Sequence, residues 1–174
     1  SSNYVGTTVD YTYGDISYKN KKGMIIDVPG TYSLEASSEA EKVATGFLEE
    51  GADVIICVLD ATHLDRNLDL ALRLREYSIP IVYSLNLIDV AERQGITIDK
   101  DKLEEKLGAP VIPTVAIKNK GLKDLMDKVF SICGQTIEPF PNQDEDERWA
   151  NINKIVEEVQ SYEYKEPTFI QKLE

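Results

Sequence analysis

Several residues in this sequence have the types and spacing needed to bind a nucleotide. The stretch GMIIDVPGTYSL, residues 23–34, runs apolar residues into Asp27 and then breaks at Pro29 and Gly30. In this D-x-P-G pattern, Asp27 can hold a water on Mg²⁺, and Gly30, which has no Cβ, lets a backbone N–H approach a terminal phosphate. An isolated D-x-P-G also occurs in ordinary turns, because Pro fixes φ and Gly adopts positive φ. The pattern therefore needs support from other residues.

A second group of residues has the chemistry to recognise guanine. After the apolar run IPIVYSL comes NLID, which contains Asn86 and Asp89. The Asp89 carboxylate can accept the ring N–H and the exocyclic amine of guanine, a donor pair that adenine lacks. Asn86 would brace this loop, and Leu87 between them could cover the base with its aliphatic side chain. In PTVAIK, the small residue Ala116 can offer its backbone N–H to the guanine oxygen. Such a site would select GTP over ATP.

A third element lies near the beginning of the sequence, in YVGTTVDYTYG. The hydroxyl of Thr8 could ligate Mg²⁺, and its backbone could sense a γ-phosphate. Gly6 would give this loop its conformational freedom. These elements, taken in order along the chain, predict a GTPase domain that binds GTP or GDP with Mg²⁺.

The elements that must position these residues follow an α/β pattern. Apolar strand candidates alternate with amphipathic helices, which is typical of a sheet with helices on both faces. Residues 24–26 are expected to lie buried in this sheet and to deliver Asp27 to its carboxyl end, where ligands bind in such folds. The expected strands are 11–19, 24–27, 53–60, 79–86 and 109–114, and the expected helices are 38–50, 64–77, 101–107 and 121–132.

The last part of the chain differs in composition from the predicted domain at 1–137. Residues 138–147, EPFPNQDEDE, are interrupted by proline and then acidic, so we interpret them as a linker. In 148–174, an amphipathic helix is expected either to fold back on its own domain or to dock on another domain or partner. Its apolar face would carry Trp149, Ile152, Val156 and Val159.

Composition limits the classes of partner. The 174 residues carry a formal net charge of −12, which disfavours nucleic acid and anionic membrane surfaces. No apolar run is long enough to span a membrane, and no signal peptide is recognised, so the chain as given is expected to be soluble and cytosolic. The two cysteines, Cys57 and Cys133, are expected to be buried and free in a reducing compartment.

These motifs give the chain a resemblance to a known family. It resembles the cytosolic G domain of the ferrous iron transport protein B family, bacterial and archaeal Fe²⁺ transporters with an amino-terminal GTPase. The resemblance covers residues 3–125, and the pairing of DVPGTYSL with DATHLDRNL is much more specific than a general GTPase match. The tail EPTFIQKLE resembles the stretch before that family's first transmembrane helix. The resemblance over residues 3–125 is carried by the stretches VGTTVDYTYG, IIDVPGTYSL, SSEAEKVATGFL, LDATHLDRNLDLALRL, LNLIDVAERQGITID and LGAPVIPTVAIKNKGL.

The resemblance implies a P-loop GTPase-like (Ras-like) α/β fold and a role for each matching residue. Nucleotide would be bound by Gly30, Asn86, Asp89, Val115 and Ala116, and Mg²⁺ by Thr8 and Asp27. Thr8 would also serve in catalysis. The remaining switch residues would be Gly6, Thr7, Val28, Pro29 and Thr31. Val115 stands where the family usually has serine, and Tyr4, Val5 and Gly6 stand where it usually has Trp-Pro-Gly.

The resemblance also implies a partner and a place in the cell. The transmembrane part of the same transporter would be the partner, at the cytoplasmic face of the cell membrane, and self-association is a further possibility. Thr31 stands where many GTPases have a water-orienting glutamine, so hydrolysis in the complete protein is expected to be slow.

One expected motif does not occur in this sequence. There is no G-x-x-x-x-G-K-[ST], whose backbone and lysine hold the β- and γ-phosphates. In the family this loop, with its strand and helix, precedes the Thr8 segment. We therefore expect either a truncated sequence or a domain that naturally lacks the P-loop, with impaired nucleotide binding and weak or absent GTPase activity.

Two other functions stay open from the sequence. A soluble assembly GTPase of the ribosome- or tRNA-associated kind shares the G-T-T pattern, but its basic RNA-binding extension is missing and the acidic charge argues against it. A nucleotide-free interaction module would use the switch surface alone.

Overall fold

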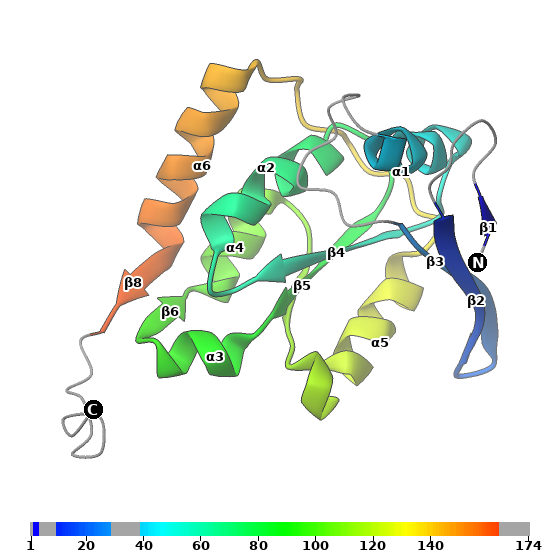
Figure 1. The fold of residues 1–174 in the computed structure, drawn as a ribbon, viewed down its shortest axis with the longest axis horizontal. Helices are drawn as coiled ribbons and strands as arrows, with labels where there is room; N and C mark the ends of the chain where they lie inside the picture. Colours follow the sequence, from blue (N-terminus) through cyan, green and yellow to red (C-terminus); the bar gives the residue numbers. More distant parts are fainter. Residues whose placement is uncertain (1, 4–9, 29–38, 164–174) are drawn as a thin grey trace.

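The computed structural model describes residues 2–3, 10–28 and 39–163 of the chain. Its centre is a 3-stranded parallel sheet with β5 in the middle (Figure 1). The alternation of strands and helices confirms the predicted α/β fold, although each of these strands begins two residues later than expected. The strands are β4 (Ile55–Asp60), β5 (Ile81–Asn86) and β7 (Val111–Pro113), and the main helices around them are α2 (Leu64–Leu74), α4 (Lys100–Leu107), α5 (Leu122–Ile132) and α6 (Glu145–Val159).

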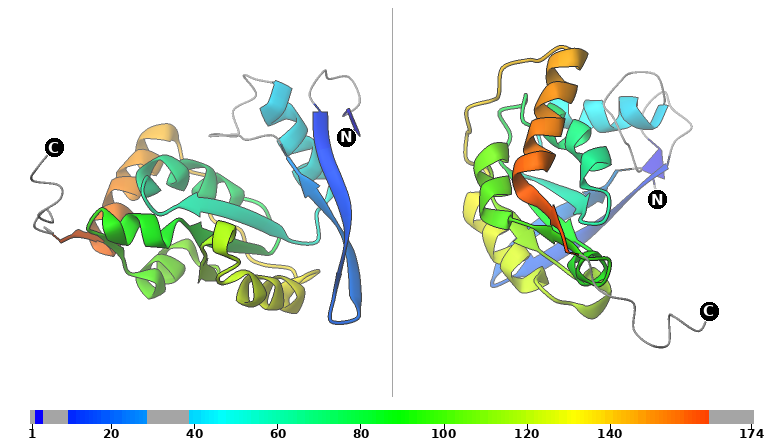
Figure 2. Two further views of the ribbon diagram at one scale, coloured as in Figure 1. Left: turned by 60° about the horizontal axis from the view of Figure 1, so that its bottom comes forward. Right: turned by 90° about the vertical axis from the view of Figure 1, so that its left-hand side faces the viewer.

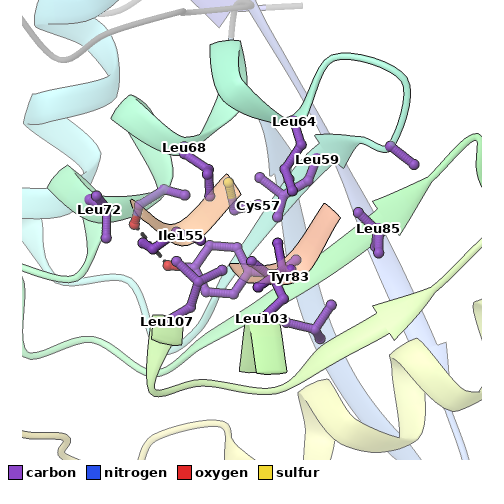
Figure 3. Close-up of a cluster of buried hydrophobic side chains, with 14 of the residues drawn as sticks. Cys57, Leu59, Leu64, Leu68, Leu72, Tyr83, Leu85, Leu103, Leu107 and Ile155 are labelled. Atoms are coloured by element: carbon purple, nitrogen blue, oxygen red, sulfur yellow. Dashed lines mark hydrogen bonds between the residues drawn. The ribbon is translucent and has the colours of Figure 1, made fainter. Parts of the chain in front are cut away.

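Helices cover both faces of this sheet because β5 is apolar on both sides. Tyr83 of β5 lies in the larger hydrophobic cluster, where its hydroxyl donates a 2.8 Å hydrogen bond to the carbonyl of Ala71 (Figure 3). On the opposite face, Val82 packs against Leu125 and Val129 of α5. A strand that is buried on both faces is typical of the middle of a parallel sheet. The larger cluster includes Leu59, Leu68, Leu103, Leu107, Ile152 and Ile155.

A second sheet is formed by the antiparallel strands β1 (Ser2–Asn3), β2 (Asp10–Tyr18) and β3 (Lys21–Asp27). Lys19 and Asn20 both have positive φ, which is the geometry of a tight two-residue hairpin turn. The prediction that residues 24–26 are buried is wrong, since Met24 is 61% and Ile25 48% exposed and Ile26 is only half-buried. The physical reason is that in the described structure β3 pairs only with β2 and does not enter the parallel sheet.

The β2–β3 hairpin stands at one end of the molecule and α6 at the other (Figure 2). Its tip is held against α5, where the Tyr18 hydroxyl and the Lys19 ammonium both donate to Asp127, at 2.7 and 2.6 Å. The ring of Tyr18 also stacks on Phe130. The other end of the hairpin meets helix α1 (Glu39–Glu50), because Tyr11 packs edge-on against the ring of Phe47. The hairpin is therefore fixed to the helices rather than to the parallel sheet.

Helix α6 folds back on its own domain, which confirms the first of the two alternatives for this segment. It packs against α2 and α4 and begins at Glu145, inside the predicted linker. Its buried face carries Arg148, Ile152, Ile155 and Val159, so the prediction that Trp149 belongs to this face is wrong. Trp149 is 44% exposed because Arg148 turns inward to an acidic partner on α2.

Several short elements were not predicted from the sequence. Helix α3 (Ile88–Arg93) follows β5 directly, and η1 (Ala116–Lys118) is a single turn after β7. Strands β6 (Ile96–Ile98) and β8 (Gln160–Tyr162) pair antiparallel. Within the predicted linker, Phe140 packs under the guanidinium of Arg75, 4.3 Å from the ring centre.

In the part of the chain that the structure describes, no helix has the length and apolar character to cross a membrane.

The two cysteines differ in accessibility, and this gives a first testable prediction. Cys57 is buried, and burial raises the pKa of its thiol to about 12. Cys133 is exposed directly after the end of α5, which corrects the prediction that both are buried. Because the thiolate is the reactive form, we expect an aromatic disulfide reagent at pH 8 to modify Cys133 in the native protein and Cys57 only after denaturation. A fast-reacting thiol that persists in Cys133→Ser would contradict this expectation.

Candidate functional site

The carboxyl ends of the three parallel strands bring polar side chains together at one edge of the sheet. Asp60 ends β4, Asn86 ends β5, and Thr114 follows β7. The Asn86 carbonyl accepts a 2.9 Å bond from the N–H of Ala61, which ties the ends of the first two strands together. Ligands of open α/β sheets bind at this edge.

Asn86 connects the end of β5 to the loop after β7. Its side-chain oxygen accepts the backbone N–H of Ala116 at 3.1 Å and the hydroxyl of Thr114 at 3.3 Å. Thr114 in turn shares a buried 2.8 Å hydrogen bond with Ser84. The structure thus brings Asn86 and Ala116 together, in the bracing arrangement expected for Asn86. It also shows that the Ala116 N–H, which was assigned to a guanine oxygen, donates to Asn86 here.

Asp89 lies in the first turn of α3, and its two carboxylate oxygens have different hydrogen-bond partners. One carboxylate oxygen, Oδ1, accepts the N–H of Val90 at 3.0 Å, and the other, Oδ2, lies 2.6 Å from Nζ of Lys118 and 3.4 Å from Nη1 of Arg93. The hydrogen bond from Lys118 is the main reason that the pKa of Asp89 is lowered. Asp89 is therefore an ionised acceptor at neutral pH, as recognition of two N–H donors requires.

The backbone just before Asp89 is unusual. Leu87 has φ of 62° and ψ of 28°, a left-handed conformation that costs a non-glycine residue about 1–2 kcal/mol. Such conformations persist where the surrounding structure enforces them, and they are concentrated at ligand-binding sites. This turn sends the chain from the end of β5 into α3, and so places Asp89 beside the loop after β7.

The loop after β7 is a compact turn that is closed by its own backbone. Val115 and Lys120 exchange two backbone hydrogen bonds, at 3.1 and 3.2 Å, around the single turn of η1. Gly121 closes the loop with φ of +77°, and a Cβ there would lie only 2.1 Å from the carbonyl oxygen of Pro113. Val115 itself is buried. The turn projects Ile117, which is 86% exposed, and Lys118 toward solvent.

Two residues at this site were missed in the sequence, Ile117 and Lys118. Ile117 is a large apolar side chain that the fold leaves uncovered beside Ala116, and Lys118 meets Asp89 across the site. The signal that could have indicated them was their position immediately after Ala116, in the same loop as two predicted site residues.

The phosphate side of the predicted site is described only in part. Asp27 is the last residue of β3 and is exposed, and Val28 follows it. The predictions for Gly6, Thr7, Thr8, Pro29, Gly30 and Thr31 concern positions outside the described residues.

The donor chemistry of Asp27 fits Mg²⁺ bound at a nucleotide. Among residues 2–3, 10–28 and 39–163, no group of three or more His, Cys, Asp or Glu side chains could hold a metal ion. Mg²⁺ at a nucleotide does not need such a group, because it keeps several waters and binds one or two protein oxygens together with substrate phosphates. An exposed carboxylate at a strand end meets that requirement.

Comparison with known proteins places these features in a family. A sequence model described as "Ferrous iron transport protein B" matches residues 1–129. The "Fe(2+) transporter FeoB" of Escherichia coli (strain K12) is 41% identical over 128 residues, which cover 71% of this chain and 17% of that protein. This chain therefore matches only a small part of the length of that relative.

Solved structures agree with this match. The cytosolic domain of L. pneumophila FeoB superposes with a TM-score of 0.82 at 31% identity, over 92% of this chain and 88% of that one. A point mutant of S. thermophilus NFeoB bound to GDP gives a TM-score of 0.83 at 27% identity, over 92% of this chain and 89% of that one.

Proposed function

This chain belongs to the ferrous iron transport protein B family, and we propose that it is the guanine-nucleotide-binding part of a membrane transporter for Fe²⁺. The single observation that carries the nucleotide proposal is that the segments after β5 and β7 are joined twice, by the Ala116 N–H to Asn86 and by Lys118 to Asp89. A carboxylate and a backbone N–H on two segments joined in this way suit the donor and acceptor edge of guanine.

Two aliphatic residues extend this base site. Leu87 is fixed by its left-handed backbone next to Asp89, and Ile117 is exposed next to Ala116. We propose that they contact the flat faces of the guanine ring, since these faces carry no hydrogen-bonding groups and covering them with apolar side chains removes both from water. Val115 anchors this loop through its backbone pairing with Lys120.

The proposal for the phosphate side of the site is supported by the sequence motifs and by the family match. We propose that Thr8 and Asp27 hold Mg²⁺ and that Gly30 offers its N–H to the γ-phosphate, with Gly6, Thr7, Val28, Pro29 and Thr31 in the two switch segments. Mg²⁺ would neutralise charge on the phosphates. Because Thr31 is shorter than a glutamine, hydrolysis would be slow and would depend more on Thr8. Nucleotide state would be passed to the transmembrane part of the same transporter, at the cytoplasmic face of the membrane.

Binding measurements on two forms of the protein test this proposal. Because no G-x-x-x-x-G-K-[ST] occurs in residues 1–174, most donors to the phosphates would be missing from this chain alone. We expect the full-length protein to bind GDP in preference to ADP, and residues 1–174 to bind GDP at least about tenfold more weakly. Isothermal calorimetry on both forms is the measurement. Equally tight binding by residues 1–174 would show that the phosphate site has been misplaced, and lack of preference for GDP over ADP would contradict the base site.

A further inference from the structure

In the base site proposed above, two groups that guanine would need already have partners within the protein. Lys118 Nζ lies 2.6 Å from Oδ2 of Asp89, and the Ala116 N–H donates to Asn86. Both interactions come from the same turn, η1, and both occupy a group that guanine would need. Both contacts would therefore have to break when a guanine base binds.

We propose that Lys118 is an internal competitor for the guanine base: Lys118 pairs with Asp89 when no base is bound and must leave before the base can bind. This inference rests on the proposed function, because it assigns Asp89 to guanine. It adds a residue that sets how tightly the nucleotide is held.

The chemistry of the two side chains makes competition the expected relation. An ammonium group carries only donors and no acceptor, and the guanine edge that meets Asp89 also carries only donors. Lys118 therefore cannot bridge the base to the carboxylate, and the two donors of guanine would need both oxygens. Oδ1 accepts the N–H of Val90, whereas Oδ2 accepts from both Lys118 and Arg93, which makes Oδ2 the oxygen from which Lys118 must be displaced.

Displacing Lys118 from Asp89 should cost little free energy, so the site can still bind nucleotide. Its side chain is 48% exposed, so the ammonium can return to water as the base arrives. Exposed ion pairs are weak, and their removal changes an equilibrium by a factor of about two to five. Arg93 stays near Oδ2 from the next turn of α3 and limits the charge change at Asp89. Lys118 thus lowers nucleotide affinity moderately without abolishing it.

Substitutions at Lys118 in the full-length protein test this inference. Lys118→Met keeps the aliphatic stem and removes the charge, so we expect it to bind a fluorescent GDP analogue about two- to fivefold more tightly than wild type. Lys118→Arg keeps the pair and should bind like wild type. Lys123→Met removes the same charge from the following helix α5, at a residue that forms no ion pair with Asp89 in the described structure, and should leave the affinity unchanged.

Two further measurements separate competition from a merely structural role. High salt screens an exposed pair, so the difference between Lys118→Met and wild type should shrink as salt is raised. In an Asp89→Asn background, where no carboxylate remains at position 89, Lys118→Met should not change the affinity for a xanthosine nucleotide. A gain of the same size in that background would overturn the inference.

The outcomes for the inference and for the proposed function are distinct. If wild type binds guanine nucleotide and Lys118→Met binds it equally or more weakly, Lys118 does not compete with the base, and only the inference fails. If wild type does not bind guanine nucleotide, the proposed function fails and the inference fails with it.

Discussion

Replacing Asp89 by asparagine in the full-length protein is expected to weaken the binding of GDP and GTP by about 100-fold or more. Among the described residues of the proposed base site, this carboxylate is the group that would offer two acceptors to the paired donors of guanine. An asparagine keeps one acceptor and sets its NH₂ group against the exocyclic amine of the base, so that two donors face each other. Titration of a fluorescent GDP analogue measures this loss.

The same variant should gain affinity for a different base. Xanthine carries an oxygen where guanine carries its exocyclic amine, and the asparagine NH₂ can donate to that oxygen while its carbonyl accepts the ring N–H. We therefore expect Asp89→Asn to bind xanthosine diphosphate more tightly than wild type does. A variant that merely unfolds the loop would lose both nucleotides, so the gain distinguishes altered recognition from damage.

A matched control is available on the neighbouring helix. Asp101 lies in the first turn of α4, as Asp89 lies in the first turn of α3, and its side chain is 89% exposed. Asp101→Asn should bind GDP as wild type does. If Asp89→Asn keeps wild-type affinity for GDP and gains none for xanthosine diphosphate, the base pocket lies elsewhere.

The positions of Asn86 and Asp89 at the carboxyl end of β5 could be predicted from the sequence because the signal for the end of a buried strand is local. An apolar run that ends in polar residues indicates the carboxyl end of a buried strand, and β5 confirms this pattern. Parallel strands end at one edge, so residues that follow successive strands meet there. The contact between Asn86 and Ala116 follows from that topology.

The interactions that were missed join positions far apart in the chain. Lys118 and Asp89 are 29 residues apart, and the sequence around each gives no sign of the other. The exposure of Met24 depends on which strands lie beside β3 in space, which the apolar run itself cannot show. Strands β6 and β8 have only 3 residues each, too few for a pattern of alternation.

The orientation of α6 shows how a tertiary contact overrides helical periodicity. The spacing of apolar residues favours a face that includes Trp149, but Arg148 forms a buried ion pair with Asp69 of α2, 79 residues away. Successive helical residues point about 100° apart, so turning Arg148 inward turns Trp149 toward solvent. The helix is therefore positioned by this buried charged pair together with Ile152, Ile155 and Val159.

Breaking this pair should produce a large loss of stability. The Arg148 side chain is 5% exposed and the Asp69 side chain 11% exposed, and their N–O distance is 2.5 Å. Arg148→Met would leave the buried Asp69 carboxylate with Arg73 as its remaining described ion-pair partner, at 3.2 Å. Because Arg73 compensates this buried charge only in part, we expect the free energy of unfolding to fall by about 3 kcal/mol. Urea denaturation followed by circular dichroism measures the change.

Two further variants show whether the loss of stability comes from the buried Asp69 charge that Arg148→Met leaves without its main partner. The double variant Asp69→Leu with Arg148→Met places two apolar side chains between α2 and α6, and should be less destabilised than Arg148→Met alone, since apolar replacement of a buried pair is often tolerated. Lys106→Met removes the more exposed pair of α6 with α4, formed by Lys106 and Glu158, and should have a much smaller effect. If Arg148→Met is no more damaging than Lys106→Met, the buried pair does not hold α6 in place, and the apolar contacts of the helix alone determine its position.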